Sequence, residues 1–570
     1  MARTYERAWL GHDLLAGVVV TALLIPAGMG YAEAAGLPPE TGLYATIVPL
    51  LVYALVGPSR TLVLGPDSSL APIIAAAVLP LAAGDSERAV ALAGLLAVLM
   101  GAALVIGSLA RLGFVTNLLS KPIRVGYLNG IALVIIVGQT SKLLGFDAEG
   151  DSLVGTARLT FEGIAQRDIN WYAAAIGGAS LLLIVWARIA HSRFPALVVA
   201  VAGSMVVVAV AGWGDQLPVV GALPEGLPAP ALGGLSWADV GELIGPALGI
   251  ALIAFTDTAV LSRSLAARRG ERVDGNQEMA AIGLASGAAG LTGGFPVSAS
   301  SSRTPVAEEA GARTQLVGVV GAVLVAAFIL LAPGVTAYLP SATLAAVVIM
   351  AGTSLMDLPA MLRLGRAEAV EGLLSLAAFV GVALVGVLQG IIIAIALSFA
   401  ALVYNASRPY RTELVRIRGR RGYHDRTRHP EGARIPGVLI VRFDAPLFFA
   451  NAALLESEVH KRVEEAADRR DEPPVRHVVL SAEPITDVDA TAVDTLTDLD
   501  DYLASRDIRL LFAEMKGPVK DQLAAYGLGD RFGRDRFFPT VGAAVDELTG
   551  TLRYDFGSPD ATEEGPGPSA

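Results

Sequence analysis

Two polar segments interrupt an otherwise apolar chain, and their residue types are suited to binding an anion. Residues Gly293 to Thr304 read GGFPVSASSSRT, and residues Gly57 to Ser69 read GPSRTLVLGPDSS. Both contain glycine and proline, which break helices, and both bring serine hydroxyls into the following apolar run. Interrupted hydrophobic segments at matching places in two halves of a chain indicate the substrate site of a secondary transporter.

These segments predict a site built from helix N-termini. If helices that start near Pro66 and Val297 face each other at mid-membrane, their unpaired N–H groups and positive dipole ends form a cradle for an anion. Arg303 would add a permanent positive charge, and five serines would add hydroxyl donors. The serines are Ser68, Ser69, Ser300, Ser301 and Ser302. Helix capping and close helix packing are their alternative roles.

Arg303 is a charge in apolar surroundings. On insertion scales an arginine at the centre of a membrane helix costs roughly 2.5 to 3.5 kcal/mol, so such a residue is normally paired or functional. The alternative to anion binding is a structural ion pair of Arg303 with Asp257 or Glu309.

Acidic residues near the two segments are candidates for ion coupling. Asp257 lies in the run GPALGIALIAFTDTAVLS, where a carboxylate must be protonated, paired or hydrated. We assign coupling to Asp257, with Glu309 as a second candidate. Asp257 could instead extend toward the loop that begins at Arg263. Asp67 is placed at a helix start, where capping explains it as well as contact with an anion does.

The composition is that of a membrane protein. Hydrophobic residues make up 53% of the 570 residues and charged residues 17%, and many runs before residue 405 approach the ~20 residues that span a bilayer. The first predicted membrane helix is Leu14 to Ala32, since no signal-peptide cleavage site is visible.

The net charge of −11, without a pooled basic face, argues against a nucleic-acid partner. There is no cysteine and no metal-ligand spacing among the six histidines, so disulfides, thiol chemistry and cysteine-ligated metals are excluded.

Hydropathy predicts about fourteen spans, several of them short or broken, in two halves. The halves cover about 11–213 and 237–405, and the connector between them, Gly214 to Leu235, has no lysine or arginine. Basic residues recur instead between alternate spans, so the positive-inside rule places those loops and both termini in the cytoplasm. We therefore expect an all-α membrane domain, residues 1–407, with a seven-plus-seven inverted repeat.

The chain changes character after Asn405. Nine arginines from Arg408 to Arg434 predict a basic cytoplasmic linker, 408–434, near anionic lipid. Residues 435–552 predict a small α/β domain with strands in GVLIVRF, RHVVLSA and IRLLFAEM. Its helices are expected at 454–467, 490–505, 519–526 and 541–548. The tail, 553–570, is rich in glycine, proline and acids and is predicted to be disordered.

Several segments together resemble the sulfate permease (SulP) family of anion transporters. They are IPAGMGYAEAAGLPPETGLYATIVPLLVYALVG (Ile25 to Gly57), RTLVLGPDSSLA, SSSRT and, in the C-terminal domain, PLFFANA. The resemblance implies a fourteen-span inverted-repeat fold with core and gate domains, followed by a cytoplasmic STAS domain. It also implies transport of sulfate, bicarbonate, chloride or a C4-dicarboxylate, often with a proton or sodium, and a homodimer.

The resemblance places Pro26 and Ala27 at the anion site. Many members have glutamine after this proline, so Ala27 predicts a less polar pocket. Sodium-coupled bicarbonate relatives tend to have threonine one helical turn after the acid, where this chain has Leu261. The departure favours a coupling proton, or anion exchange, over sodium. Glu33, near the outer end of the first helix, is a candidate for proton entry. No cofactor is expected.

The STAS resemblance concerns a regulatory loop. In soluble relatives this loop reads Asp-Ser-Ser/Thr-Gly and carries a phosphorylated serine, whereas this chain has Asp489, Ala490, Thr491 and Ala492. Alanine replaces the usual acceptor, which leaves Thr491 as the alternative, and a hydroxyl there also caps a helix. We expect the domain to support dimerisation, folding, trafficking or nucleotide-dependent modulation, or to bind a cytoplasmic protein.

Other functions stay open. The same fold serves anion channels and voltage-responsive motors, and a STAS-linked membrane sensor is a further alternative. Nucleobase symporters share the membrane architecture but usually lack a STAS domain. No nucleophile–base pair, phosphate-binding loop or metal motif supports an enzyme. Sulfate is the first expected substrate, with bicarbonate and a C4-dicarboxylate as alternatives.

Overall fold

The chain divides into two compact units, Met1–Ser398 and Phe399–Ala570. The computed structural model describes residues 5–113, 120–148, 150, 152–190, 195–224, 226, 230, 232–300, 303–469 and 472–550. The first unit is helical apart from two short strands, and the second contains a mixed β-sheet.

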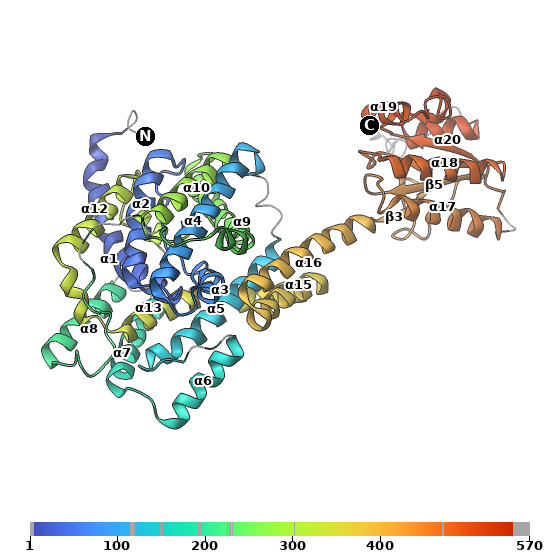
Figure 1. Ribbon diagram of the computed structural model, residues 1–570. Coiled ribbons are helices and arrows are strands. Elements are labelled where there is room, and N and C mark those ends of the chain that lie inside the picture. The colour runs from blue at the N-terminus through green and yellow to red at the C-terminus, as the bar shows by residue number, and fades with distance from the viewer. Residues whose placement is uncertain are drawn as a thin grey trace, which may run out of the picture. The chain divides into compact units, whose positions relative to one another are not determined.

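Helices dominate the first unit (Figure 1). Its N-terminal half contains α1 (Leu10–Ala34), α2 (Pro39–Val56), β1 (Leu64–Gly65), α3 (Ala71–Ala82), α4 (Ser86–Leu109), α5 (Lys121–Leu143), α6 (Leu153–Gln166), α7 (Trp171–Ile189) and α8 (Ala196–Ala211). Its C-terminal half contains α9 (Trp237–Arg269), α10 (Gly275–Leu291), β2 (Ser298–Ala299), α11 (Arg303–Glu309), α12 (Leu316–Leu331), α13 (Ser341–Leu355), α14 (Leu358–Ala367), α15 (Ala369–Val380) and the π-helix η5 (Gly381–Val385). The unit ends within α16 (Val387–Ser407).

Seven helices among the described residues are long and apolar enough to cross a bilayer, judged by length and composition. Five shorter apolar helices accompany them: Ala71–Ala82, Ala196–Ala211, Leu316–Leu331, Ala369–Val385 and Ile392–Ser407. The short spans expected from the sequence are therefore present. The first helix runs from Leu10 to Ala34 rather than from Leu14 to Ala32, and it contains Pro26 without ending there. Neighbouring helices make an internal proline tolerable in a membrane helix.

Helix contacts repeat between the two halves. Helices α1, α2 and α4 of the first half correspond to α9, α10 and α12 of the second half. The contact of α10 with α4 is matched by that of α2 with α12, and the contact of α9 with α4 is matched by that of α1 with α12. α1 contacts α2 as α9 contacts α10, while α5 contacts its counterpart α13. Exchanging the two halves leaves this pattern unchanged, as a structural repeat requires.

α4 and α10 pack backbone against backbone because glycines line their contact (Figure 1). A Cβ atom on Gly290 would lie 2.2 Å from the carbonyl oxygen of Gly94, and one on Gly101 would lie 2.5 Å from that of Gly283. Small residues let membrane helices approach this closely. The contact fixes α10, the helix that leads into β2.

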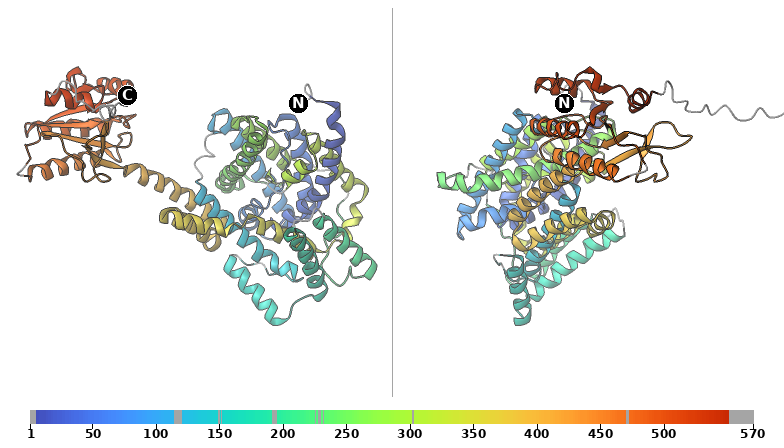
Figure 2. Two further views of the ribbon diagram at one scale, coloured as in Figure 1. Left: turned by 180° about the vertical axis from the view of Figure 1, so that it is seen from behind. Right: turned by 90° about the vertical axis from the view of Figure 1, so that its right-hand side faces the viewer.

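The second unit is a six-stranded sheet with helices on both faces (Figure 2). The strand order is β4-β3-β5-β6-β7-β8, with β5 to β8 parallel and β3 antiparallel to both of its neighbours. The elements are β3 (Arg411–Arg416), β4 (Tyr423–Asp425), β5 (Val438–Phe443), α17 (Ala452–Ala467), β6 (His477–Ser481), α18 (Ala490–Ala504), β7 (Arg509–Ala513), α19 (Gly517–Ala525), β8 (Phe537–Phe538) and α20 (Val541–Thr549).

Alternate residues of β5 enter two different hydrophobic cores. Leu439 and Val441 pack with α17 and α18, whereas Ile440 packs with α20. Both faces of the strand are therefore buried, which explains why it is apolar almost throughout.

The interpretation of residues 408–434 as a linker is wrong for the two strands inside it. β3 pairs with β4 and β5, and its residue Glu413 is 2% exposed. Glu413 accepts hydrogen bonds from Arg426 at 2.6 Å and Arg434 at 2.7 Å. The arginines that suggested a lipid-facing linker thus include partners of a buried acid. The predicted disordered tail, 553–570, lies outside the described residues.

Candidate anion-binding site

The two interrupted segments meet as a short antiparallel ladder. Leu64 pairs with Ala299 and Gly65 pairs with Ser298. The Ser300 N–H extends the ladder by donating to the Val63 carbonyl at 3.1 Å. All of these residues are buried. Segments some 230 residues apart therefore form one buried unit from which α3 and α11 begin.

Arg303 occupies this junction and is 2% exposed. Its Nη2 donates a hydrogen bond to the Pro66 carbonyl, and its guanidinium carbon lies 5.9 Å from the centre of the Tyr31 ring. Its Nε and Nη1 have no hydrogen-bond partner among the residues that the structure describes. A buried guanidinium with unused donors is a costly arrangement unless a ligand or water completes it. It therefore makes this junction the candidate position for an anion.

The turn before α3 adds backbone donors to the same junction. The Ser69 N–H donates to the Asp67 side chain at 3.1 Å, and the N–H groups of Leu70 and Ala71 donate to the Asp67 carbonyl. This leaves the N–H groups of Asp67 and Ser68 without an acceptor in the described part of the chain. α3 is twelve residues long, so its N-terminus also carries a positive partial charge.

Two carboxylates share one serine hydroxyl next to this turn. The Ser69 hydroxyl lies 2.8 Å from Asp67 Oδ2 and 3.4 Å from Asp257 Oδ2. The Tyr127 hydroxyl of α5 donates to Asp257 Oδ1 at 3.2 Å. One hydroxyl can donate to only one acceptor at a time, so two ionised carboxylates leave one of these contacts unmade. A proton on Asp257 would relieve that conflict and the like-charge repulsion.

α9 connects this acid to the other interrupted segment. Thr258, which follows Asp257, accepts a hydrogen bond from the Ala299 N–H through Oγ1 at 3.1 Å. Neighbouring residues of one helix thus contact the turn before α3 and the strand before α11. Asp257 and Thr258 therefore link the two sides of the junction.

The structure brings most of the sequence-predicted residues to this junction. Pro26 and Ala27 are buried within α1, and α1 contacts both α3 and α11. Ser68 is buried in the turn before α3. Ser300 is buried and accepts from the Arg303 N–H at 3.2 Å, so it caps α11.

Three of the predicted residues are not placed there. Ser301 and Ser302 lie outside the described residues. Glu309 is exposed at the C-terminal end of α11. An ion pair of Arg303 with Asp257 or Glu309, the alternative to anion binding, is not formed in the part of the chain that the structure describes.

Sequence reasoning missed the residues that hold the segment before β1. Glu278 of α10, which is fully buried, accepts from the Tyr53 hydroxyl at 2.5 Å and the Ser59 hydroxyl at 3.2 Å. Gln315 Nε2 donates to the carbonyls of Ser59 and Leu62 at 2.9 and 2.8 Å. The signal that could have identified Glu278 is its acidic side chain beside the apolar run that follows it.

The predicted regulatory residues have defined places in the second unit. Asp489 caps α18 by accepting from the Ala492 N–H at 2.8 Å, and its other oxygen accepts from the Phe449 N–H at 2.8 Å. Thr491 is exposed in the first turn of α18. Its hydroxyl is therefore accessible, whereas Asp489 is committed to holding two segments together.

The fold and the junction define a class: a helical multi-pass membrane protein with paired interrupted segments, followed by an α/β unit. Models of two known families match the chain. The sulfate permease family model matches residues 10–378, and the STAS domain model matches residues 429–544. The chain therefore belongs to the sulfate permease family, which comprises transporters rather than enzymes.

Relatives match over nearly the full length. The chain is 39% identical over 544 residues to a Mycobacterium tuberculosis protein named probable sulfate transporter Rv1739c, covering 95% of this chain and 96% of the relative. It is 28% identical over 571 residues to sulfate transporter 1.3 of Arabidopsis thaliana, covering 96% and 86% of the two chains.

Solved structures share the fold at low sequence identity. The murine anion transporter Slc26a9 in its inward-facing state matches with a TM-score of 0.88 and 20% identity, covering 96% of this chain and 93% of the other. The transmembrane domain of the cyanobacterial bicarbonate transporter BicA matches with a TM-score of 0.59 and 20% identity, covering 69% and 98%. These likenesses concern the fold alone.

Proposed function

We propose that this protein is a secondary active sulfate transporter that binds the anion at the junction of β1 and β2. The observation that carries the proposal is the buried Arg303 guanidinium, whose Nε and Nη1 are unused among the described residues. The N–H groups of Asp67 and Ser68 and the start of α3 add donors, and the Asp67 and Asp257 carboxylates lie beside the same turn.

Sulfate is favoured over other anions by the relatives. A 39% identical relative and a plant relative are both named sulfate transporters. The bicarbonate transporter BicA shares only the fold, at 20% identity. Bicarbonate and a C4-dicarboxylate are the alternative substrates, because a guanidinium and backbone N–H groups bind any small oxyanion.

We assign proton coupling to Asp257. It shares the Ser69 hydroxyl with Asp67 and contacts Tyr127, so a proton arriving there changes the hydrogen bonds beside the anion position. Leu261, one turn further along α9, supplies no ligand for sodium. Glu309 is a weaker candidate because it is exposed.

The proposal includes a topology and partners. Basic loops between alternate spans favour a plasma-membrane protein with both termini in the cytoplasm. We propose a homodimer, with the STAS domain supporting assembly or binding a cytoplasmic protein. Thr491 is an accessible hydroxyl for regulation of that domain.

Binding of labelled sulfate to the purified protein tests the site. Unlabelled sulfate should compete strongly, and bicarbonate and fumarate should compete weakly. Stronger competition by either of these would move the substrate to that anion. Binding of none of the three anions would overturn the transporter proposal and favour a membrane sensor.

A further inference from the structure

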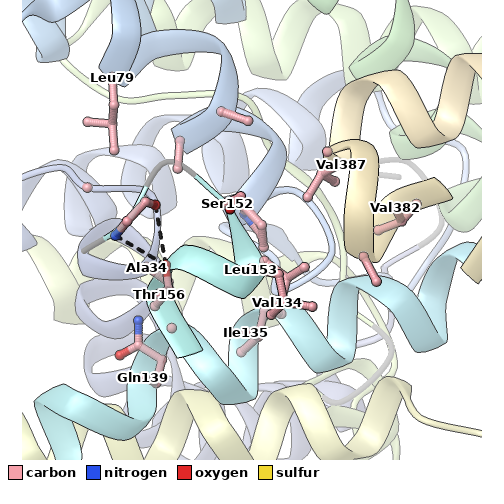
Figure 3. A pocket seen from close by; sticks show the side chains of 18 of the residues that line it. Ala34, Leu79, Val134, Ile135, Gln139, Ser152, Leu153, Thr156, Val382 and Val387 are labelled. Atoms are coloured by element: carbon pink, nitrogen blue, oxygen red, sulfur yellow. Dashed lines mark hydrogen bonds between the residues drawn. The ribbon is translucent and has the colours of Figure 1, made fainter. Parts of the chain in front are cut away.

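Apolar side chains of the first unit line a cavity of about 520 Å³ between α1, α3, α5, α6 and η5 (Figure 3). Figure 3 shows Val134 and Ile135 of α5 and Val382 of η5 around it. None of the described residues that form the Arg303 junction lines this cavity. The apolar surface of the cavity is thus bounded by helices of the first unit. The second unit differs, because its large apolar side chains that lack cover concentrate at the end of one helix.

Six large apolar or aromatic side chains are exposed among the described residues of the second unit. Three are on α16, one follows that helix and one is in the loop before α17: Phe399, Leu402, Tyr404, Tyr410 and Phe449. The sixth, Tyr526, directly follows α19. Phe449 is the most exposed of the six, at 68%. Single apolar residues at a surface are ordinary, but a group of them marks an interaction site.

A buried asparagine fixes the loop of Phe449 to the last turn of α16. The Asn451 Nδ2 donates to the Ala406 carbonyl at 3.2 Å and to the Pro446 carbonyl at 2.9 Å. Its Oδ1 accepts from the Phe448 N–H at 3.0 Å. Carbonyls in the last turn of a helix lack partners within the helix, so the first of these bonds satisfies one of them. Two residues of chain span at most about 7 Å, so Phe449 stays close to the end of α16.

The residues at the end of α16 are typical of a membrane–water interface. The helix is apolar over Ile392–Ser407. The guanidinium carbon of Arg408 lies 4.6 Å from the centre of the Tyr404 ring. Tyrosine is enriched where membrane helices meet the headgroups, and arginine there keeps its stem in apolar surroundings and its charge in water. We therefore expect α16 to leave the bilayer between Tyr404 and Arg408.

We infer that Phe449 anchors the loop before α17 in the headgroup region of the bilayer, beside the end of α16. The partner is lipid because Asn451 holds this loop at the point where the helix leaves the membrane. Aromatic side chains of membrane-surface segments enter about 5–10 Å into the boundary between headgroups and acyl chains. The Phe449 N–H donates to Asp489 at 2.8 Å, so the residue that caps α18 also orients the anchor. The inference goes beyond the proposed function and holds for any transported anion.

The absence of cysteine from the sequence permits a direct test in the full-length protein. Ala450→Cys, next to Phe449 and half-buried, carries an environment-sensitive nitrobenzoxadiazole label in vesicles of phosphatidylcholine. Ala504→Cys is the matched control, because Ala504 is exposed at the far end of α18. A helix of this length places it about 20 Å from Asp489. The vesicles contain phosphatidylcholine with a nitroxide quencher either near the headgroup or at the end of an acyl chain.

The label at Ala450→Cys should be quenched, and more strongly by the nitroxide near the headgroup. The label at Ala504→Cys should not be quenched. Adding Phe449→Ser to Ala450→Cys should lower quenching to the level of the control, because the apolar anchor is lost. Phe449→Leu should keep most of the quenching, because it keeps an apolar side chain. Phe449 is exposed, so neither change removes a buried contact.

The emission of the label distinguishes the other possible partners. A blue-shifted label at Ala450→Cys that no lipid nitroxide quenches would show that protein covers the loop, and this would overturn the inference. Emission typical of water would also overturn it, as would equal quenching at Ala450→Cys and Ala504→Cys. These readouts need no transport, so failure of the anchor and failure of the proposed function are separate results.

Discussion

The Arg303 guanidinium is the single group on which the proposed anion binding most depends. Replacing it by alanine removes at least two charge-assisted hydrogen bonds, each worth about 1.5–3 kcal/mol, and should weaken sulfate binding by ten-fold or more. Arg303→Lys retains the charge but not the planar pair of donors, so its affinity should fall between those of the parent and Arg303→Ala. Titration of purified, folded variants with sulfate measures this, and equal affinities would show that Arg303 has only a structural role.

Asp257 should carry the dependence on a proton gradient. Asp257→Asn keeps the shape of the side chain but cannot exchange a proton, so uptake should become equal in the presence and absence of an inward-acidic gradient. Asp239→Asn is the control on the same helix, because Asp239 pairs with Arg88 and Ser236 at the start of α9. That variant should keep its response to the gradient. A gradient response that survives in Asp257→Asn would assign coupling elsewhere.

Single residues were predictable where their chemistry conflicts with their surroundings. Arg303 and Asp257 stand out because a charge inside an apolar run needs a partner or a function. Glu278 did not stand out, because its partners Tyr53 and Ser59 lie more than 200 positions away. Only the tertiary structure shows that such a residue is enclosed.

At the level of elements, the α4–α10 contact should be intolerant of a side chain at Gly290. Gly290→Ala would place a Cβ atom 2.2 Å from the Gly94 carbonyl oxygen, and forcing the helices apart typically costs about 1–3 kcal/mol. Gly287→Ala, on the same helix, meets nothing within 4 Å. Melting temperatures in detergent should fall for Gly290→Ala and stay near the parent value for Gly287→Ala. Equal temperatures would mean that the helices do not pack this closely.

Strand β4 should stabilise the second unit in a pH-dependent way. Burial acts to raise the pKa of Asp425, but hydrogen bonds from Thr412, Tyr410 and Thr427 outweigh it and lower the pKa to about 2. Thr412 donates at 2.6 Å and the Thr427 N–H at 2.8 Å. Because the folded-state pKa lies below the ordinary value of 3.8, this carboxylate stabilises the fold above about pH 4 and loses that effect as the pH falls toward 2.

Asp425→Asn should therefore lower the unfolding free energy by about 1 kcal/mol at pH 7, the usual size of a lost hydrogen bond. The difference from the parent should shrink below pH 4. Urea unfolding of residues 408–550 at several pH values measures it. A difference that is constant with pH would show that the charge of Asp425 contributes nothing.

Elements were predictable according to how strongly their burial appears in the sequence. β5, β6 and β7 are buried on both faces and appear as short apolar runs. β3 was missed because Arg411, Glu413 and Arg416 break that pattern, and the ion pairs of Arg411 and Glu413 form only in the fold. β1 and β2 have two residues each, too few for any periodicity.

At the level of the whole molecule, the proposed site depends on the two halves coming together. The N-terminal half supplies Asp67, Ser68 and Ser69, and the C-terminal half supplies Asp257 and Arg303. The sequence indicated this pairing through its matching interruptions, but the register of Leu64 with Ala299 and the capping by Ser300 depend on tertiary contacts. The identity of the anion depends on the same fine geometry.

Uptake of labelled sulfate by the purified protein in liposomes tests the central claim most directly. It is measured at inward-acidic and at symmetric pH, with unlabelled bicarbonate and fumarate as competitors. We predict that the gradient stimulates uptake and that unlabelled sulfate blocks it more strongly than either competitor does. Absence of sulfate uptake at both pH conditions would contradict the assignment of this protein as a proton-coupled sulfate carrier.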